Sequence, residues 1–281
     1  MGTVAGREFQ FGQKEFQFLS KLIYNRSGIV LPGHKMDLIY GRLARRLRAL
    51  GLATFRDYCA LLHADESGQE TAYMINAITT NLTRFFREEH HFEHLKEYVL
   101  KPFLEQVHRP GGARKLRIWS AGCSTGEEPY SIAMTIAEVL GVPVGHDIKV
   151  LATDLDTTVI EKGRQGSYRV SDLETLPKGL RRQFFVAGGS DTEVIVESVK
   201  SLVTFRQLNL VDPWPIKGPF DAIFCRNTMI YFDKPTKTSL VARFRDLLAP
   251  GGVLYVGHSE SFTAPQSDLR SIGRTAYTRA A

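Results

Sequence analysis

The stretch that decides the fold is Leu116-Arg-Ile-Trp-Ser-Ala-Gly-Cys-Ser-Thr-Gly-Glu-Glu-Pro-Tyr130. Residues 114–120 alternate basic and apolar side chains before small residues take over, as in a strand that enters a core. Gly122 and Gly126 permit a tight turn and let a ligand approach the backbone. Apolar positions then recur at helical spacing as far as Leu140. The stretch predicts a strand, a glycine loop and a helix, which is how a nucleotide-binding α/β fold begins.

The start of this helix also bears on the ligand. Ser124 and Thr125 can each cap the helix, and Glu127 and Glu128 can close a capping box. Both glutamates would repel the pyrophosphate that a dinucleotide site places on a helix N-terminus. A ligand with a sulfonium and an ammonium group meets no such repulsion. We therefore expect S-adenosylmethionine rather than NAD at the Gly122 loop, although the glutamates can also serve only the cap and the helix dipole.

The composition is that of a soluble globular protein. The 281 residues are 43% hydrophobic and 23% charged. No apolar stretch is long enough to cross a membrane, and the N-terminal residues show no apolar core of a signal peptide. The three cysteines, Cys59, Cys123 and Cys225, are far apart, which predicts a reduced cytoplasmic setting and no disulfide. His34, His90, His91 and His258 show no ligand spacing, so no metal site is expected. The net charge of +6 indicates an acidic partner.

The first part of the chain predicts a helical domain over residues 1–87. Four segments have helical spacing and none has a strand pattern: residues 15–24, 35–50, 54–63 and 70–82. Thr54 is the expected cap of the third. In the second, Arg42, Arg45 and Arg46 share one stripe, which is either a solvated face or a surface for an acidic helix or a phosphate backbone.

Strands and helices alternate in residues 88–281, after a long helix over 88–107 that we expect to break or kink at Pro102. A strand over 147–155 ends at Asp154, where such folds hold the ribose hydroxyls of an adenosine. Asp156 can instead cap the following helix.

Later strands complete the expected sheet. Short strand patterns predict a small antiparallel insertion at about 184–206, and residues 220–226 form an apolar strand. Ligands of open α/β sheets lie beyond the carboxyl ends of the strands. This places Asn209 and Asn227 with the Gly122 loop and Asp154 around one crevice.

Five stretches together resemble the CheR family of chemotaxis receptor methyltransferases. They are 43–51 (LARRLRALG), 79–87 (TTNLTRFFR), 124–131 (STGEEPYS), 220–227 (FDAIFCRN) and 230–232 (IYF). The resemblance implies an α/β fold: a Rossmann-like class I S-adenosylmethionine-dependent methyltransferase domain with an antiparallel β insertion, preceded by a small all-helical domain. It also implies methyl transfer to glutamate side chains of methyl-accepting chemotaxis receptors, with S-adenosylhomocysteine as the product and without a metal.

The resemblance also implies roles for single residues. Arg87 lies next to the transferred methyl group, with Tyr231 close by, and the helix with Arg42, Arg45 and Arg46 faces the receptor. The implied cofactor contacts are Asn81, Thr83, Arg87, Gly122, Glu128, Asp154, Asn209, Leu210, Arg226 and Asn227. Arg87 can hold the substrate carboxylate by a bidentate pair, or contact only the cofactor or the domain interface.

The expected partners are the cytoplasmic helical domains of the receptors, approached by a monomer that inserts into no membrane and binds no nucleic acid. Some relatives dock a receptor tail through a glycine-richer insertion hairpin. Because Ala187–Glu193 is shorter and more acidic, we expect direct recognition of the methylation helices instead.

Two other functions stay open at this point. A nucleic-acid methyltransferase would use Cys225 as a nucleophile, although the basic stretch lacks interleaved aromatics. A scaffold of the signalling array would bind the cofactor without turnover.

Overall fold

The structure is a computed structural model that describes residues 7–109, 115–141, 147–260 and 269–279. The chain divides into two compact units. The helical unit comprises Met1–Thr80 together with Tyr231–Asp233, and the sheet unit comprises Asn81–Ile230 and Lys234–Ala281.

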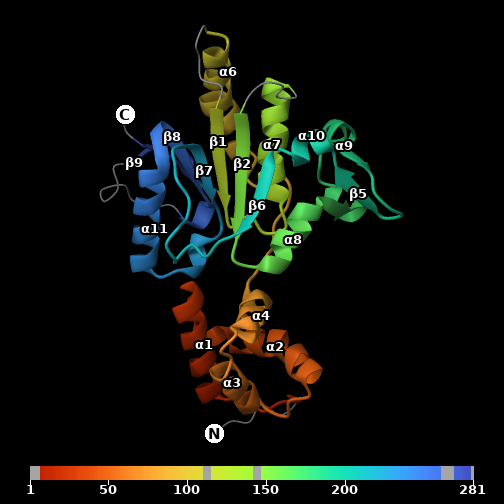
Figure 1. Ribbon diagram of the computed structural model, residues 1–281, viewed down its shortest axis with the longest axis vertical. Helices are drawn as coiled ribbons and strands as arrows, with labels where there is room; N and C mark the ends of the chain where they lie inside the picture. Colours follow the sequence, from red (N-terminus) through yellow and green to blue (C-terminus); the bar gives the residue numbers. More distant parts are fainter. Residues whose placement is uncertain (1–6, 110–114, 142–146, 261–268, 280–281) are drawn as a thin grey trace. The chain divides into compact units, whose positions relative to one another are not determined.

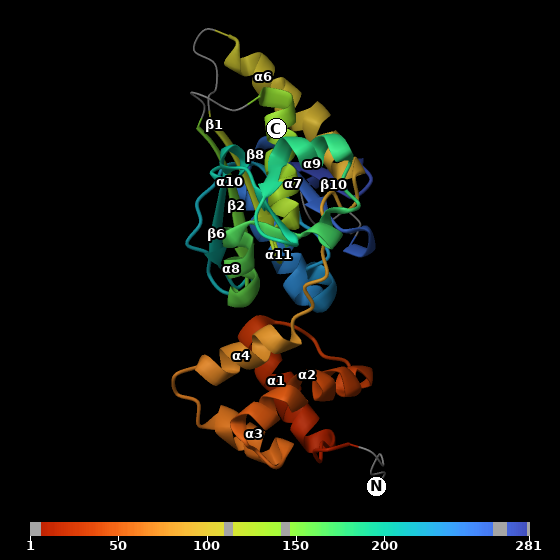
Figure 2. The same ribbon diagram turned by 90° about the vertical axis from the view of Figure 1, so that its right-hand side faces the viewer.

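The helical unit packs its apolar stripes into a core of its own (Figure 2). Leu19, Ile23, Ile39 and Leu43 are fully buried there, as their helical spacing predicts. Thr54 caps the third helix and forms a capping box, which confirms the predicted cap. The elements are α1 (Gln13–Ser27), the 3₁₀ turn η1 (Gly33–Lys35), α2 (Met36–Leu50), α3 (Phe55–His63) and α4 (Gln69–Ile78).

The fourth helix ends earlier than its sequence pattern predicts. It stops at Ile78 rather than Leu82, because Thr79 takes an extended conformation. The guanidinium of Arg42 donates hydrogen bonds to the carbonyl oxygens of Ile78 and Thr79, the latter at 2.8 Å. A cation from α2 thus satisfies carbonyls that the end of α4 leaves without helical partners.

The sheet unit is built on a twisted, mostly parallel sheet, so the predicted α/β class is confirmed (Figure 1). The described residues form seven strands in the order β6-β2-β1-β7-β8-β10-β9, with β10 antiparallel to both of its neighbours. Strands buried on both faces need near-continuous apolar sequence, which β7 has apart from Asp221. β1 carries Lys115 and Arg117 at its start and is continuously buried only over 118–121. The strands are β1 (Lys115–Ala121), β2 (Asp147–Asp154), β6 (Val203–Gln207), β7 (Phe220–Cys225), β8 (Leu248–Val256), β9 (Leu269–Gly273) and β10 (Ala276–Arg279).

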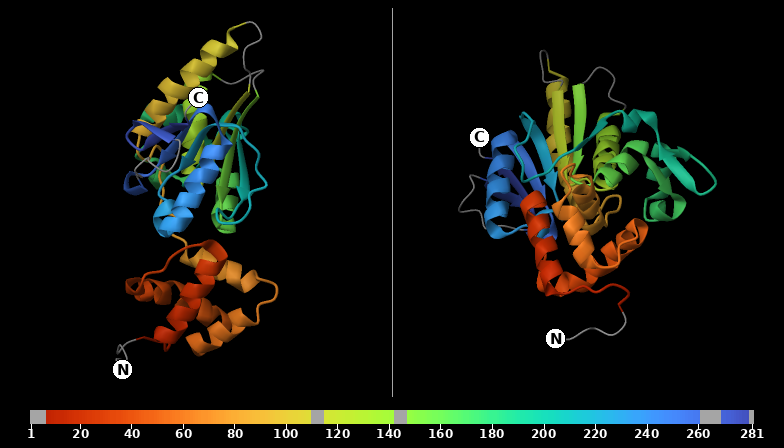
Figure 3. Two further views of the ribbon diagram at one scale, coloured as in Figure 1. Left: turned by 90° about the vertical axis from the view of Figure 1, so that its left-hand side faces the viewer. Right: turned by 60° about the horizontal axis from the view of Figure 1, so that its bottom comes forward.

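Helices pack along this sheet (Figure 3). The helix α7 (Glu127–Leu140) packs on β1, β2 and β6, and α8 (Thr157–Gln165) packs on β2 and β6. The helix α11 (Lys234–Leu247) packs on β8. None of the described helices combines the length and the apolar character that crossing a membrane requires.

The segment before β1 is helical from His90 to Val107, with a π-helical turn in the middle. It consists of α5 (His90–Leu95), the π-helical turn η2 (Lys96–Leu100) and α6 (Lys101–Val107). Pro102 is the second residue of α6, separated from the end of the π turn by one residue. A proline inside a helix removes one backbone donor and clashes with the carbonyl four residues earlier, and a π turn accommodates such a misfit.

The small antiparallel sheet differs from the predicted insertion of residues 184–206. Its order is β3-β5-β4, so it begins at Ser167, whereas the strand at 203–207 belongs to the large sheet. That strand, β6, pairs in parallel with β2, with Val203 opposite Val150. The prediction was wrong here because strand pattern does not reveal the pairing partner. The elements are β3 (Ser167–Arg169), η3 (Val170–Leu173), α9 (Lys178–Phe184), β4 (Phe185–Ala187), β5 (Thr192–Ile195) and α10 (Glu197–Lys200).

The boundary between the two units falls between Thr80 and Asn81, earlier than the boundary at Arg87 expected from sequence. The intervening segment is tied to the sheet unit by hydrogen bonds. Ser124 Oγ donates to the carbonyl of Asn81 at 2.8 Å, and the amide of Phe86 donates to Ser131 Oγ at 2.9 Å.

Candidate cofactor site

The residues expected around one crevice follow the ends of four adjacent parallel strands. The registers set Ala121 opposite Thr153, Ser120 opposite Phe224, and Asp154 opposite Gln207. Since parallel strands end at the same edge, the Gly122 loop, Asp154, and the segments that follow β6 and β7 share this carboxyl edge. These segments hold Asn209 and Leu210 after β6, and Arg226 and Asn227 after β7.

The loop after β1 is held by backbone hydrogen bonds. The amides of Gly122 and Cys123 donate to the carbonyl oxygen of Thr153 at 2.8 and 2.9 Å. Gly122 has a φ of 88°, and a Cβ there would lie 2.2 Å from Thr228 Oγ1. Both the left-handed backbone and the close approach of Thr228 therefore require glycine at this position.

The cap of α7 differs from the prediction. Its N-cap is Gly126, with φ 101° and without a side-chain hydrogen bond, so neither Ser124 nor Thr125 caps the helix. Ser124 Oγ is engaged with the Asn81 carbonyl, and Thr125 Oγ1 donates to Glu127 Oε2 at 2.6 Å. The amide of Gly126 donates to the carbonyl of Cys123, which closes a turn. Because of this turn, the hydroxyls of Ser124 and Thr125 lie outside the capping position.

Asp154 is the acidic group at the end of β2. Its two carboxylate oxygens accept from the amides of Ser124 at 2.8 Å and Asp156 at 3.1 Å. Burial raises the pKa of Asp154, and these amide donors oppose that rise. A carboxylate offers about four lone-pair positions, so acceptor capacity remains for a ligand hydroxyl. Asp156 itself caps α8 through the amide of Thr158, the alternative weighed for this residue.

The segment from Asn81 to Arg87 runs beside the glycine loop. Besides the bond from Ser124 to its carbonyl, Asn81 donates from Nδ2 to Asp156 Oδ2 at 2.8 Å. Thr83 and Arg87 are half-buried, and an Arg87 nitrogen donates to the carbonyl of Leu82 at 3.0 Å. The segment is thus fixed to both the β1 and the β2 loops.

Arg226 is the buried cation of the site, with a side chain only 2% exposed. One of its nitrogens lies 3.0 Å from Glu128 Oε2, while Glu128 Oε1 accepts from Ser120 Oγ at 2.7 Å. Its other terminal nitrogen donates to the carbonyl of Arg87 and lies 3.5 Å from Glu88 Oε2. Burial raises the pKa of Glu128, and the charge of Arg226 opposes that rise. Arg226 therefore positions the backbone of Arg87.

Asn227 is held by a residue that sequence reasoning missed. Asn227 has a φ of 57°, and its amide donates to Glu260 Oε2 at 2.7 Å. The buried carboxylate of Glu260 also accepts from the amides of Ile230 at 3.0 Å and Gly257 at 2.7 Å. A charged residue in an otherwise apolar strand-and-turn region is the only sequence signal for this role. On the other side of the edge, the carbonyl of Leu210 accepts from Trp214 and Arg243.

Four predicted residues lie in the helical unit. Arg46 pairs with Glu70 and lies 4.0 Å over the ring of Tyr73, while Arg42 binds the end of α4. Arg45 is exposed. Tyr231 accepts from the amide of Val30 through its carbonyl, and Lys35 lies 5.6 Å over its ring. Their roles toward receptor and substrate stay predictions.

The cysteines are free, and two of them, Cys123 and Cys225, are buried. Burial raises the pKa of Cys225 far above its ordinary value, which disfavours the thiolate that a pyrimidine methyltransferase needs. Among the histidines, His90 and His258 come together with Glu88, although the sequence reading assigned them no chemistry. Glu88 and His90 are two residues apart, which was the available signal.

Comparisons with known proteins match almost the whole chain. A family model described as CheR methyltransferase, all-alpha domain, matches residues 14–79, and one described as CheR methyltransferase, SAM binding domain, matches residues 81–278. Chemotaxis protein methyltransferase 2 of Pseudomonas aeruginosa is 45% identical over 278 residues, 98% of this chain and 96% of the relative. The chemotaxis protein methyltransferases of Klebsiella aerogenes and Escherichia coli are 47% and 45% identical; each alignment covers 93% of this chain, and 88% and 89% of those relatives.

Proposed function

Because the chain belongs to the CheR methyltransferase family, we propose that it methylates glutamate side chains of methyl-accepting chemotaxis receptors, using S-adenosylmethionine. The relatives' names supply the receptor context of this proposal, since each is called a chemotaxis protein methyltransferase. The observation that carries it is the attachment of the Asn81–Arg87 segment to the carboxyl edge of the sheet through Ser124 and Arg226.

The residues at this edge fit an adenosyl cofactor. Asp154 retains acceptor capacity for a ribose hydroxyl. The first turn of α7 contains two glutamates, which disfavour binding of an anion such as a pyrophosphate at this helix N-terminus. When bound, S-adenosylmethionine supplies a methyl group activated by a sulfonium. Asn81, Thr83, Glu128, Asn209, Leu210, Arg226 and Asn227 are the further positions proposed to contact or shape its site.

The chain's part in the reaction is alignment. A glutamate carboxylate, with an ordinary pKa near 4.3, is already ionised at neutral pH and needs no general base. In-line displacement then depends on holding a carboxylate oxygen behind the methyl carbon. Arg87, fixed through its carbonyl by Arg226, is proposed to orient that carboxylate.

Methyl transfer to a purified receptor cytoplasmic domain tests this function. Labelled S-adenosylmethionine should leave base-labile label on the receptor domain. Arg87→Ala should lower kcat/KM by about 100-fold, the loss expected when a charge-assisted pair to the reacting group is removed. Arg84→Ala is the matched control, because Arg84 is an exposed arginine of the same segment, and it should keep wild-type activity.

Other outcomes would change the assignment. Label in RNA would favour the nucleic-acid methyltransferase, and cofactor binding without transfer would favour the scaffold. Equal activity of Arg87→Ala and Arg84→Ala would remove Arg87 from the mechanism.

We further propose that recognition is direct rather than through a receptor tail. In the small sheet, Arg181 pairs with Glu193 of β5 at 2.6 Å, and the amides of Gly188 and Gly189 donate to the carbonyl of Thr192. The hairpin is thus short and closed by its own hydrogen bonds. Tight capture of a receptor tail peptide, lost on changing this hairpin, would contradict the proposal.

A further inference from the structure

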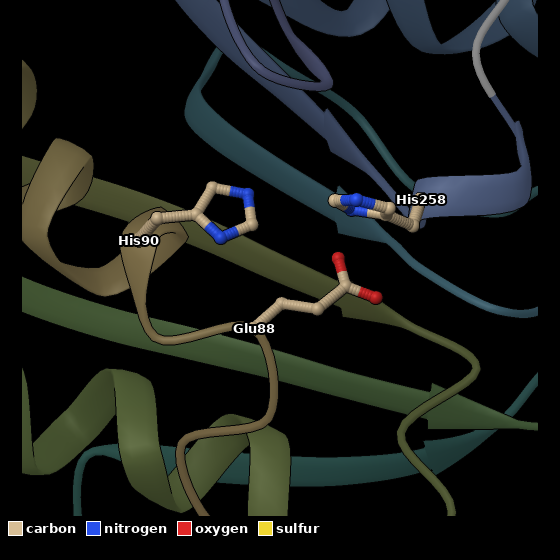
Figure 4. Close-up of side chains that lie close together, drawn as sticks. All are labelled: Glu88, His90 and His258. Carbon is tan, nitrogen blue, oxygen red and sulfur yellow. The ribbon is translucent and has the colours of Figure 1, made fainter.

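Three side chains with metal-binding atoms meet near the ends of β7 and β8. One ligand atom each from Glu88, His90 and His258 lies within 4.8 Å of the other two. Figure 4 shows the two imidazole rings and the carboxylate facing one another. His90 begins α5 and Glu88 lies two residues before it, whereas His258 begins the 3₁₀ turn η5 (His258–Glu260) after β8.

Backbone geometry fixes two of the three positions, Glu88 and His258. Glu88 has a φ of 58°, a left-handed conformation that a glutamate adopts only when its surroundings enforce it. The carbonyl of Glu88 accepts from the amide of His91 at 3.0 Å. On the other side, the amide of Glu260 donates to the carbonyl of Gly257, which fixes the turn that carries His258. The backbone positions of Glu88 and His258 are therefore fixed by the fold.

Two of the three have buried atoms without a hydrogen-bond partner. Within the described part of the chain, neither Glu88 Oε2 nor His90 Nε2 makes a hydrogen bond, although Glu88 Oε2 lies 3.5 Å from an Arg226 nitrogen and 3.6 Å from His91 Nδ1. Buried polar atoms in folded proteins are nearly always hydrogen-bonded, so His90 Nε2 above all calls for a missing partner. A cation bound by the carboxylate and the imidazoles would supply it.

The charged side chains around the cluster do not balance one another, and the excess is negative. Arg226 lies between two carboxylates, 3.0 Å from Glu128 and 3.5 Å from Glu88. One positive charge thus faces two negative ones. The exposed Arg274 also acts on His90, but solvent screens it.

We propose that Glu88, His90 and His258 form a binding site for a divalent transition-metal ion of the zinc type. Two imidazoles and one carboxylate suit Zn²⁺, Co²⁺ or Ni²⁺, whereas Mg²⁺ and Ca²⁺ prefer oxygen ligands alone. Three protein ligands leave a coordination position for water or for an outside carboxylate. The exposed His258 gives the ion access from solvent. The site does not depend on the proposed reaction, although Glu88 directly follows Arg87.

Metal titration of untagged, chelator-treated protein tests the site. Titration with Co²⁺ followed by visible absorption, and with Zn²⁺ by calorimetry, should show one saturable equivalent. His258→Ala should weaken binding by at least about 100-fold, since removing a ligand costs no less than disturbing its outer shell. The control His108→Ala removes an exposed histidine outside the cluster and should bind as the wild type does.

Two further measurements make the outcome decisive. His90→Gln should also lose binding, and the Co²⁺ spectrum should lack thiolate charge-transfer bands, which would instead assign the ion to a cysteine. Far-ultraviolet circular dichroism checks that each variant is folded. Absence of stoichiometric binding, or wild-type affinity in both His258→Ala and His90→Gln, overturns the site.

Discussion

The buried pair of Arg226 and Glu128 gives the sharpest test of the structure. The two side chains are 2% and 12% exposed, and their charged atoms are 3.0 Å apart. Glu128→Gln keeps the shape but leaves Arg226 with only Glu88, at 3.5 Å. Removing one partner of a buried pair leaves an uncompensated charge and typically costs about 3–5 kcal/mol. Because Glu88 remains, we expect a loss near the low end, about 3 kcal/mol in the free energy of unfolding.

The reverse change and the double change sharpen the prediction. Arg226→Met leaves Glu128 and Glu88 without their cation and the carbonyl of Arg87 without a donor, so it should cost about 4–5 kcal/mol. The double variant should cost about 2 kcal/mol less than the sum of the single changes, because neither partner is then left alone.

Urea unfolding followed by tryptophan fluorescence measures this in the full chain without added cofactor. Both tryptophans, Trp119 and Trp214, belong to the sheet unit, and their rings lie 5.0 Å apart. The matched control is Glu97→Gln, which breaks the exposed pair with Lys101 and should cost less than about 1 kcal/mol. If Glu128→Gln costs no more than Glu97→Gln, or if the double variant is additive, the argument for a buried structural pair fails.

Three further predictions concern packing, capping and acid stability. Gly163→Ala in α8 should destabilise the protein by about 1–3 kcal/mol, because its Cβ would lie 2.4 Å from a ring carbon of Phe205. The control Gly179→Ala, with no atom within 4 Å of its Cβ, should be neutral or slightly stabilising in the same urea assay. Thr54→Ala should cost about 1 kcal/mol by removing the cap of α3, seen as lower thermal stability of the helical unit. Hydrogen bonds, chiefly from the amide of Thr71, lower the pKa of Asp65 from 3.8 to about 2, so its ionised form stabilises the fold above about pH 4. That contribution should disappear as the pH falls from about 4 to 2, and Asp65→Asn should flatten the stability curve in this window.

Each of these predictions has an outcome that contradicts it. Equal stability of the two glycine variants would mean that the Phe205 ring moves aside without lowering the free energy of unfolding. Unchanged thermal stability of the helical unit in Thr54→Ala would mean that the capping box of Thr54 and Asp57 does not stabilise the unit. An NMR titration that gives Asp65 an ordinary pKa would remove the basis of the acid prediction.

Much of the fold follows from local patterns in the chain. The run from Leu116 to Tyr130 predicts strand, loop and helix because alternation, glycine and helical spacing act within a few residues. Thr54 predicts a cap for the same reason, and the structure confirms it and adds a capping box with Asp57. The order of elements at the carboxyl edge also follows, since parallel strands end together.

Part of the candidate site could be predicted and part could not. Asp154 could be predicted as a candidate because an acidic residue at the end of the second strand has a fixed place in such folds. Glu260 was missed, because its role is to accept hydrogen bonds from three backbone amides that only the fold brings to it. Arg226 was expected as a cofactor contact, whereas the structure adds its burial between Glu128 and Glu88.

The sequence by itself determined the two kinds of domain, the cap of α3, and the family. Only the tertiary structure decided that Val203–Gln207 pairs with β2 and that His258 meets Glu88 and His90. The physical reason is range: backbone propensity and capping act between near neighbours in the chain. Strand partners, buried charges and converging side chains depend on contacts between distant segments, which exist only once the chain has folded.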